Sequence, residues 1–308
     1  MKNEFKLYEH AANIPEDRNN PSQKSLEYPN LTEAGVEKAR EEALSLLKEI
    51  TDAAPGTVIW LGGNSYIPRS RDTLKVVSSV LEERCKSESG EDILFFSQEK
   101  LKGLADGLKE TEEGEASGRG YHHAVDEIVK AADQHPSAKV VIDLPLRIKQ
   151  LSDKDWYVME GKMKEYQDQL CKDFDLFSEY GENYALATKK WFEYPDTAPA
   201  HERTPHPLEV AKSYLQGLNR LMDFTRKYAK DRPVKVVVVG HSLEINALLT
   251  YLTNKGIISA EGFEKLGDTT IDFAESATIE FREDTIVTNY REHEYTFAIP
   301  ESLTEKKS

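Results

Sequence analysis

The stretch from Val234 to Ile245 constrains the fold of this chain more than any other. Val236 to Val239 are four consecutive β-branched residues. Such a run is typical of a strand buried on both faces in a parallel sheet. Gly240 ends the run, and an apolar pattern of helical period begins at Ile245. We therefore expect His241 and Ser242 at the carboxyl end of a central strand, where open α/β sheets bind their ligands.

Other segments alternate between the two kinds of secondary structure. Short apolar runs predict strands at 5–8, 57–61, 93–96 and 139–143, and amphipathic patterns predict helices at 31–50, 69–85, 121–132 and 208–230. Thr32 is a candidate N-cap for the first helix. The alternating residues of 277–281 and 285–290 indicate an antiparallel hairpin at the sheet edge. The expected fold class is α/β, a three-layer α/β/α sandwich with a mostly parallel central sheet.

The chain is long enough for one large domain or two. We expect a single α/β domain over residues 1–300, with an inserted helical cap at about 97–205 that covers the site and a frayed tail at 301–308. Within the cap range, residues 101–120 are rich in Gly and Glu and predict a loop. Residues 152–194 have an amphipathic, helical pattern.

Charge and composition exclude several kinds of protein. The formal net charge of −15 argues against nucleic-acid partners, which need a basic face. It also means that an anionic substrate would need a local positive pocket. The N-terminus has no apolar core of signal-peptide length, and no stretch approaches the ~20 apolar residues of a membrane span. We therefore expect a cytoplasmic protein without a membrane partner.

Nothing in the sequence predicts a metal site. Cys85 and Cys171 are isolated, fit no metal-ligand spacing and are expected to be reduced packing residues. His122 and His123 are adjacent in a predicted helix, so their side chains point apart and are expected on the surface. No metal and no cofactor are expected.

The first hypothesis for the strand end is a serine hydrolase. Gly240-His241-Ser242-Leu243 matches the start of the Gly-x-Ser-x-Gly elbow, with Ser242 as nucleophile. Glu244 occupies the place of the second glycine, which lets strand and helix approach closely. His293 is the one histidine downstream of Ser242, and it lies in a charged stretch typical of solvated surface. This hypothesis ranks third.

Several segments, in order, resemble the histidine phosphatase superfamily, the phosphoglycerate-mutase-like proteins. Leu31-Thr32-Glu33-Ala34-Gly35 matches the family's Leu-Thr-x-x-Gly before its first helix. Ser65 to Thr73 matches its Ser-x-x-x-Arg-x-x-x-Thr after the second strand, and Val236 to His241 matches its late strand with a second histidine. The resemblance covers about residues 1–96 and 205–290.

The resemblance implies a role for several residues. His10 would be the phosphohistidine nucleophile, His241 the second histidine of the pocket and Arg69 a clamp on the phosphate. Ser65 and Arg71 are further candidates for substrate binding. A neutral imidazole is a competent nucleophile near pH 7, and a guanidinium fork suits two phosphate oxygens. The partner would be a small phosphorylated substrate or a phosphoprotein.

The first motif departs from the family. The family's Arg-His-Gly is Glu9-His10-Ala11 here. One unit-charge interaction at contact distance and an effective dielectric of ~20 is worth ~4 kcal/mol, so the reversal weakens phosphate binding. Arg18, Arg71 or Arg203 could supply the missing charge, the substrate could carry a cation, or the site could have lost catalysis. The sequence does not choose among these explanations.

The general acid is a second open question. One branch of the family has a glutamate in a loop after the third strand, and there the sequence offers Asp106, with Glu110 and Glu113 further along. In the other branch the acid closely follows the second histidine, which makes Glu244 a candidate.

The function expected first is a metal-independent phosphomonoester hydrolase acting through a phosphohistidine at His10. The alternative is a catalytically degenerate member that binds a small ligand or a partner.

Overall fold

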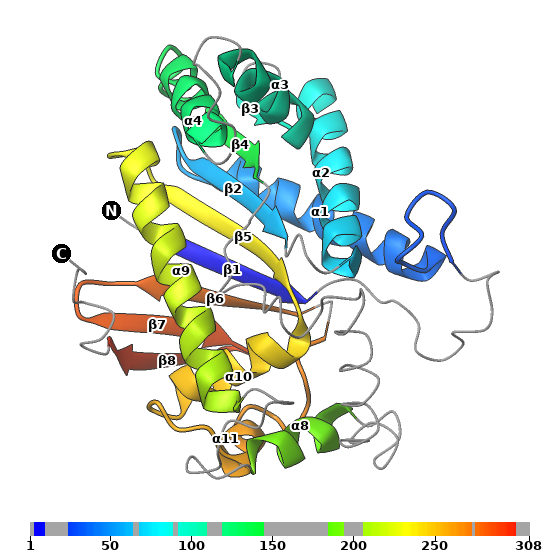
Figure 1. Cartoon of the computed structure of the whole chain (residues 1–308), viewed down its shortest axis with the longest axis vertical. Helices are drawn as coiled ribbons and strands as arrows, with labels where there is room; N and C mark the ends of the chain where they lie inside the picture. Colours follow the sequence, from blue (N-terminus) through cyan, green and yellow to red (C-terminus); the bar gives the residue numbers. More distant parts are fainter. Residues whose placement is uncertain are drawn as a thin grey trace.

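The centre of the molecule is an eight-stranded mixed sheet with the strand order β3-β4-β2-β5-β1-β6-β7-β8 (Figure 1). The computed structural model describes residues 3–9, 24–63, 68–88, 92–109, 119–144, 184–193, 206–272 and 275–299. The parallel strands are β1 (Asn3–Glu9), β2 (Val58–Gly63), β3 (Ile93–Phe96), β4 (Lys139–Asp143) and β5 (Val234–Gly240). The antiparallel strands are β6 (Ser276–Phe281), β7 (Thr285–Tyr290) and β8 (His293–Ala298).

Helices cover both faces of the parallel part of the sheet. On one face lie α1 (Glu33–Asp52) and α2 (Pro68–Glu88), and on the other α4 (Arg119–Ala132), α9 (Pro207–Ala229) and α10 (Ser242–Thr253) (Figure 1). Val237 and Val239 of β5 pack in the core under α1 and α2. Val236 and Val238 pack in the core on the other face, under α4, α9 and α10. Because both faces of β5 are buried from Val236 to Val239, no polar residue interrupts these four valines. The predicted three-layer sandwich with a mostly parallel sheet is confirmed.

The last strand, β8, was not predicted. It pairs antiparallel with β7 at the edge of the sheet, and Phe297 is its one buried residue. An edge strand with so little burial keeps charged residues such as Glu294, so its sequence resembles solvated surface. The antiparallel hairpin of β6 and β7 is confirmed, but β8 and not this hairpin forms the edge of the sheet.

The predicted loop at 101–120 is wrong for its first part. Residues Gln98–Lys109 form helix α3, which packs against α4. Gly103 and Gly107 favour a loop in the sequence, but a glycine costs a helix only ~1 kcal/mol. Leu101 is fully buried in the core, which offsets such a cost.

The expected cap range therefore contains parts of the sandwich itself. Helices α3 and α4 and strand β4 lie within 97–205, and β4 is a central strand between β3 and β2. The remaining described helix of the range is α8 (Tyr184–Phe192). It packs against α11 (Ala260–Lys265): Phe192 meets Phe263 edge to face, and the Lys189 ammonium lies 2.7 Å from the Glu264 carboxylate. Residues 145–183 and 194–205 lie outside the described residues.

Two local predictions can be compared directly. The Thr32 hydroxyl accepts a hydrogen bond from the backbone N–H of Gly35 at 2.9 Å, so Thr32 is the N-cap of α1 as expected. Cys85 is buried in the core between α2 and the sheet, as expected of a packing residue, and Cys171 lies outside the described residues. None of the helices in the described ranges is long and apolar enough to cross a membrane.

Arg232 holds together three loops at the amino edge of the sheet. Its Nε donates to the carbonyl oxygen of Gly56 at 2.7 Å, and one terminal nitrogen donates to that of Ala138 at 2.9 Å. Gly56 has φ +76°, and a Cβ atom there would lie 2.7 Å from the carbonyl oxygen of Pro136. The guanidinium therefore fixes the entry to β2, β4 and β5 together.

We predict that Arg232→Ala lowers the free energy of unfolding by about 2 kcal/mol, because two charge-assisted hydrogen bonds are lost. Urea unfolding of the variant measures the effect. Arg226→Ala is the matched control, since Arg226 is an exposed arginine of α9 whose nearest acidic partner, Asp223, is 3.9 Å away. Equal destabilisation by the two substitutions would contradict the proposed stabilising role of the Arg232 hydrogen bonds.

Candidate functional site

The candidate site lies at the carboxyl edge of the central strands. In the parallel pairing of β1 with β5, Glu9 is the partner of Gly240, and each of these residues ends its strand. On the other side of β5, Gly63 at the end of β2 is the partner of Val239. The residue that follows Glu9 in the sequence is His10, and the residue that follows Gly240 is His241. His10 itself lies outside the described residues, as does the side chain of Glu9.

His241 joins β5 to α10. It is the N-cap residue of α10, with extended backbone angles (φ −121°, ψ 140°), and its side chain does not cap the helix. The side chain is half-buried, whereas the neighbouring Ser242 is buried. The turn therefore leaves His241 more exposed to solvent than Ser242.

Helix α2 begins beside this turn. The Ser70 hydroxyl donates to the carbonyl oxygen of Gly240 at 3.2 Å. Gly63 allows the close approach, because a Cβ atom there would lie 3.0 Å from the carbonyl oxygen of Ser70. Arg69, the predicted phosphate clamp, is a half-buried residue of the first turn of α2. The structure thus brings Arg69 and His241 to the same edge of the sheet.

Two helix N-termini meet at this edge. Both α2 and α10 start at the ends of central strands, and Ser70 links the start of α2 to the residue before α10. The first N–H groups of a helix have no partner within it, and the helix dipole makes this end partly positive. An anion such as a phosphate group is therefore favoured here, against the negative charge of the whole protein.

Glu244, one candidate acid, lies in the first turn of α10 and is 3% exposed. The other candidate, Asp106, lies in α3, eight residues after Gln98, and its side chain is not described. Helix α3 follows β3, which is separated from β5 by β4 and β2. With strands ~4.8 Å apart, β3 lies ~14 Å from β5. The structure brings Glu244, and not the start of α3, next to His241.

The remaining predicted residues are placed as follows. Arg71 is half-exposed on α2, and its Nε lies 3.9 Å from the Asp72 carboxylate. Ser65, Arg18, Arg203, Glu110 and Glu113 lie outside the described residues. The side chains of His122 and His123, in α4, are likewise not described.

The serine hydrolase hypothesis requires His293 as the base beside Ser242. His293 is exposed at the start of β8, and β8 is the fourth strand from β5 in the sheet. At ~4.8 Å a strand this is ~19 Å, beyond hydrogen-bond reach of Ser242. We do not pursue this hypothesis.

Sequence reasoning missed a buried carboxyl group at the end of β4. Asp143 is 5% exposed. It accepts a hydrogen bond from the Ser78 hydroxyl of α2 at 2.6 Å and one from the Gln98 side-chain amide at the start of α3 at 2.8 Å. Burial raises the pKa of Asp143 to about 6, although both hydrogen bonds act in the other direction. The signal in the sequence was the acidic residue that ends the apolar run Val140-Val141-Ile142.

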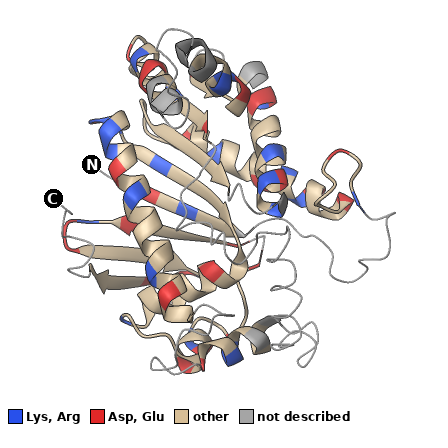
Figure 2. Ribbon diagram, viewed as in Figure 1, with Lys and Arg blue, Asp and Glu red and all other residues tan. Residues whose placement is uncertain are grey.

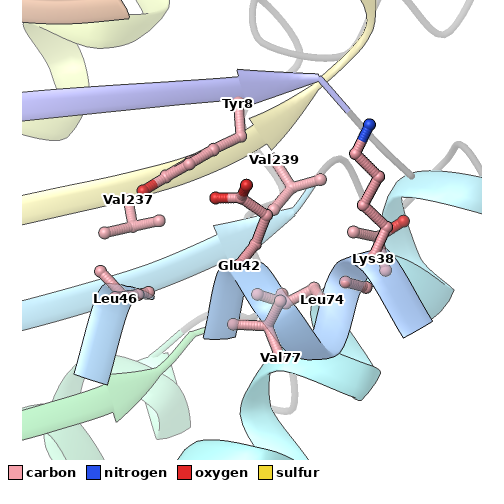
Figure 3. A pocket seen from close by; sticks show the side chains of 10 residues that line it. Tyr8, Lys38, Glu42, Leu46, Leu74, Val77, Val237 and Val239 are labelled. Atoms are coloured by element: carbon pink, nitrogen blue, oxygen red, sulfur yellow. The ribbon is translucent and has the colours of Figure 1, made fainter. Parts of the chain in front are cut away.

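A narrow pocket lies near the site, between α1, α2 and the sheet (Figure 3). Its walls are mostly aliphatic, with Val237 and Val239 of β5 and Leu74 of α2 among them. Glu42 and Tyr8 bring polar atoms to it, and burial raises the pKa of both groups. The lining does not include His241, so this pocket lies on the face of the sheet and not at the strand ends.

Charged residues also lie on the central strands (Figure 2). Lys6 of β1 and Lys235 of β5 both bind the Glu49 carboxylate of α1. Lys6 also lies over the ring of Tyr8, 4.8 Å from its centroid. These lysines have carboxylate partners, so we assign them to the packing of α1 on the sheet. No group of three or more His, Cys, Asp or Glu side chains within the described ranges could hold a metal ion.

We predict that Asp143 makes stability depend on pH. Its pKa in the folded protein is about 6 and its ordinary value is 3.8. The folded state thus binds the proton of Asp143 more tightly than the unfolded state does. The protonated carboxyl group therefore stabilises the fold fully below pH ~4, and this stabilisation is lost as pH rises through ~6. The unfolding free energy of wild type minus that of Asp143→Asn should fall by up to ~3 kcal/mol between pH 4 and pH 7, because only the wild-type side chain ionises. Urea titrations at each pH measure it, with exposed Asp92→Asn as control; a difference independent of pH would contradict this.

Comparisons with known proteins give similar structures but no sequence relative. No protein-family model matches the chain, and no curated protein matches its sequence. A structure described as mycobacterial hydrolase 2 has a TM-score of 0.43 at 16% identity, covering 99% of this chain and 96% of that one. Mycobacterial glucosyl-3-phosphoglycerate phosphatase has a TM-score of 0.38 at 14% identity, covering 90% and 89%. Phosphoglycerate mutase from Bacillus anthracis has a TM-score of 0.38 at 14% identity, covering 94% and 93%.

Identities and scores of this size say nothing about the activity of this chain.

Proposed function

We propose that the protein is a metal-independent phosphomonoester hydrolase that works through a phosphohistidine at His10. The observation that carries the proposal is the register of the two central strands. Glu9 and Gly240 are partners at the ends of neighbouring parallel strands, and a histidine follows each of them. A histidine after each of two neighbouring strand ends, at the edge of the sheet that also holds two helix N-termini and Arg69, suits the transfer of a phosphoryl group.

The proposed reaction has two steps. In the first, an imidazole nitrogen of His10 attacks the phosphorus atom, and the ester oxygen leaves. Arg69, His241 and the N–H groups at the starts of α2 and α10 stabilise the negative charge on the phosphoryl oxygens. In the second, water attacks the phosphohistidine, His10 is released and inorganic phosphate forms.

The leaving oxygen needs a proton in the first step. We assign Glu244 as its donor, because the first turn of α10 follows His241 directly and α3, with Asp106, follows a strand ~14 Å away. A carboxyl group in this role protonates the leaving alcohol and then, as a carboxylate, accepts a proton from the attacking water.

Glu9 favours a second candidate function. It replaces the arginine of the family's first motif and is the last residue of β1, directly before His10 in the sequence. A negative charge near the phosphate weakens substrate binding. The second candidate is therefore a catalytically degenerate protein that binds a small phosphorylated ligand or a phosphoprotein at the same site.

Hydrolysis of an aryl phosphate by purified variants tests the proposal. We expect wild-type activity, a loss of at least ~10³-fold in kcat for His10→Ala because the nucleophile is gone, and a loss of ~10–100-fold in kcat/KM for Arg69→Ala. Arg226→Ala is the charge control, since this exposed arginine lies on α9.

The outcomes separate the two candidate functions. Unchanged activity in His10→Ala would rule out the phosphohistidine mechanism. An inactive wild type that gains activity on Glu9→Arg would identify a degenerate site whose missing element is the positive charge.

A further inference from the structure

The pocket between α1, α2 and the sheet is a cavity of about 30 Å³ that is partly open to solvent (Figure 3). Its aliphatic walls come from α1, α2 and β5, with Leu46, Leu74 and Val237 among them. One water molecule needs about 10–15 Å³ of such space, so the cavity has room for two groups of that size. An occupant must therefore be narrow, no wider than an alkyl chain.

Glu42 of α1 brings a carboxylate to this pocket. Its side chain is half-buried, and it forms no hydrogen bond or ion pair with another described residue. Burial raises the pKa of Glu42, and the positive charges of Lys6 and Lys38 lower it by less. The lysines therefore do not replace the hydration that the carboxylate loses in the pocket.

Neither of these lysines is placed to pair with the carboxylate. The ammonium of Lys6 binds Glu49 and lies over the ring of Tyr8. Lys38 is part of the pocket lining, but its ammonium is turned away from the Glu42 carboxylate (Figure 3). The negative charge of Glu42 can therefore pair with a ligand.

Tyr8 of β1 brings a second polar group to the pocket. Its side chain is 7% exposed, and its hydroxyl has no hydrogen-bond partner within the part of the chain that the structure describes. A buried hydroxyl without a hydrogen bond is destabilising, and phenylalanine would avoid that cost. The hydroxyl oxygen can accept a hydrogen bond from an occupant of the pocket.

We propose that this pocket binds a small primary alkylammonium ion, at a site separate from the strand ends. The ammonium pairs with the Glu42 carboxylate and donates a hydrogen bond to the Tyr8 hydroxyl, and the alkyl chain lies along the aliphatic walls. The formal net charge of −15 favours a cation over an anion here. The proposal does not depend on the phosphatase reaction.

Titration of the full chain with propylammonium chloride, followed by NMR of the valine and leucine methyl groups, tests this site. We expect saturable shifts of the methyl signals of Val237 and Val239, both of which line the pocket. The Kd should be on the order of 1 mM, because a ligand of about four heavy atoms forms few contacts. Sodium chloride at the same ionic strength is the control for salt effects.

Three variants assign the binding to the polar groups. Glu42→Gln removes the charge and should weaken binding at least ~10-fold, and Tyr8→Phe removes one acceptor and should weaken it ~3-fold. Glu41→Gln is the matched control, since Glu41 is the preceding residue of α1, is exposed and does not line the pocket. Its affinity should equal that of wild type. The methyl spectrum without ligand shows that each variant is folded.

Two further probes separate charge from shape. Tetramethylammonium has the charge but no N–H donor and a wider head, so it should bind at least ~10-fold more weakly than propylammonium. Equally tight binding of 1-propanol, which has the chain without the charge, would overturn the proposal. Absence of saturable shifts in wild type, or equal affinity of wild type and either Glu42→Gln or Tyr8→Phe, would also overturn it. No measurement here requires turnover, so a failure of the proposed function leaves the result unaffected.

Discussion

The parallel pairing of β1 with β5 is the interaction on which the rest of the site depends. Its register makes Glu9 the partner of Gly240, so that two histidine-bearing segments leave the sheet from adjacent strand ends. A shift of one residue would turn every valine of β5 to the opposite face. The apolar cores on both faces fix that register, because Val236 and Val238 pack under α9 and α10, and Val237 and Val239 pack under α1 and α2. The chemistry at the edge is therefore positioned by burial in the middle of the sheet.

The electrostatics of this edge oppose the net charge of the protein. Binding a phosphate to a chain with a formal charge of −15, with Glu9 next to His10, requires positive potential at short range. The starts of α2 and α10 supply part of it, and Arg69 supplies a full charge. Close packing makes this arrangement possible: Gly63 admits α2, and Gly240 admits the phenol of Tyr214. In each case glycine is needed for space and not for an unusual backbone angle.

Much of the fold could be predicted because burial on two faces leaves an unmistakable pattern. The strands at 139–143 and 234–240 and the helix after Thr32 are of this kind, and the structure confirms them. The sequence-based predictions failed where burial is slight or a helix contains glycine. Strand β8 was not predicted, and α3 was predicted to be a loop. The position of His241 directly after β5 could be predicted, because the buried valine run ends at Gly240. The pair of Asp143 with Ser78 could not, since its members come from different elements and meet through packing alone.

The central claim is that His10 carries the phosphoryl group during turnover. Rapid quenching under alkaline conditions, in which phosphohistidine survives, followed by mass spectrometry of the peptides tests it directly. Wild-type protein mixed with an aryl phosphate should yield a phosphorylated peptide that contains His10, and His10→Ala should yield none. Phosphate on any other residue, or no phosphorylated peptide from a wild-type protein that turns over the ester, would contradict the account.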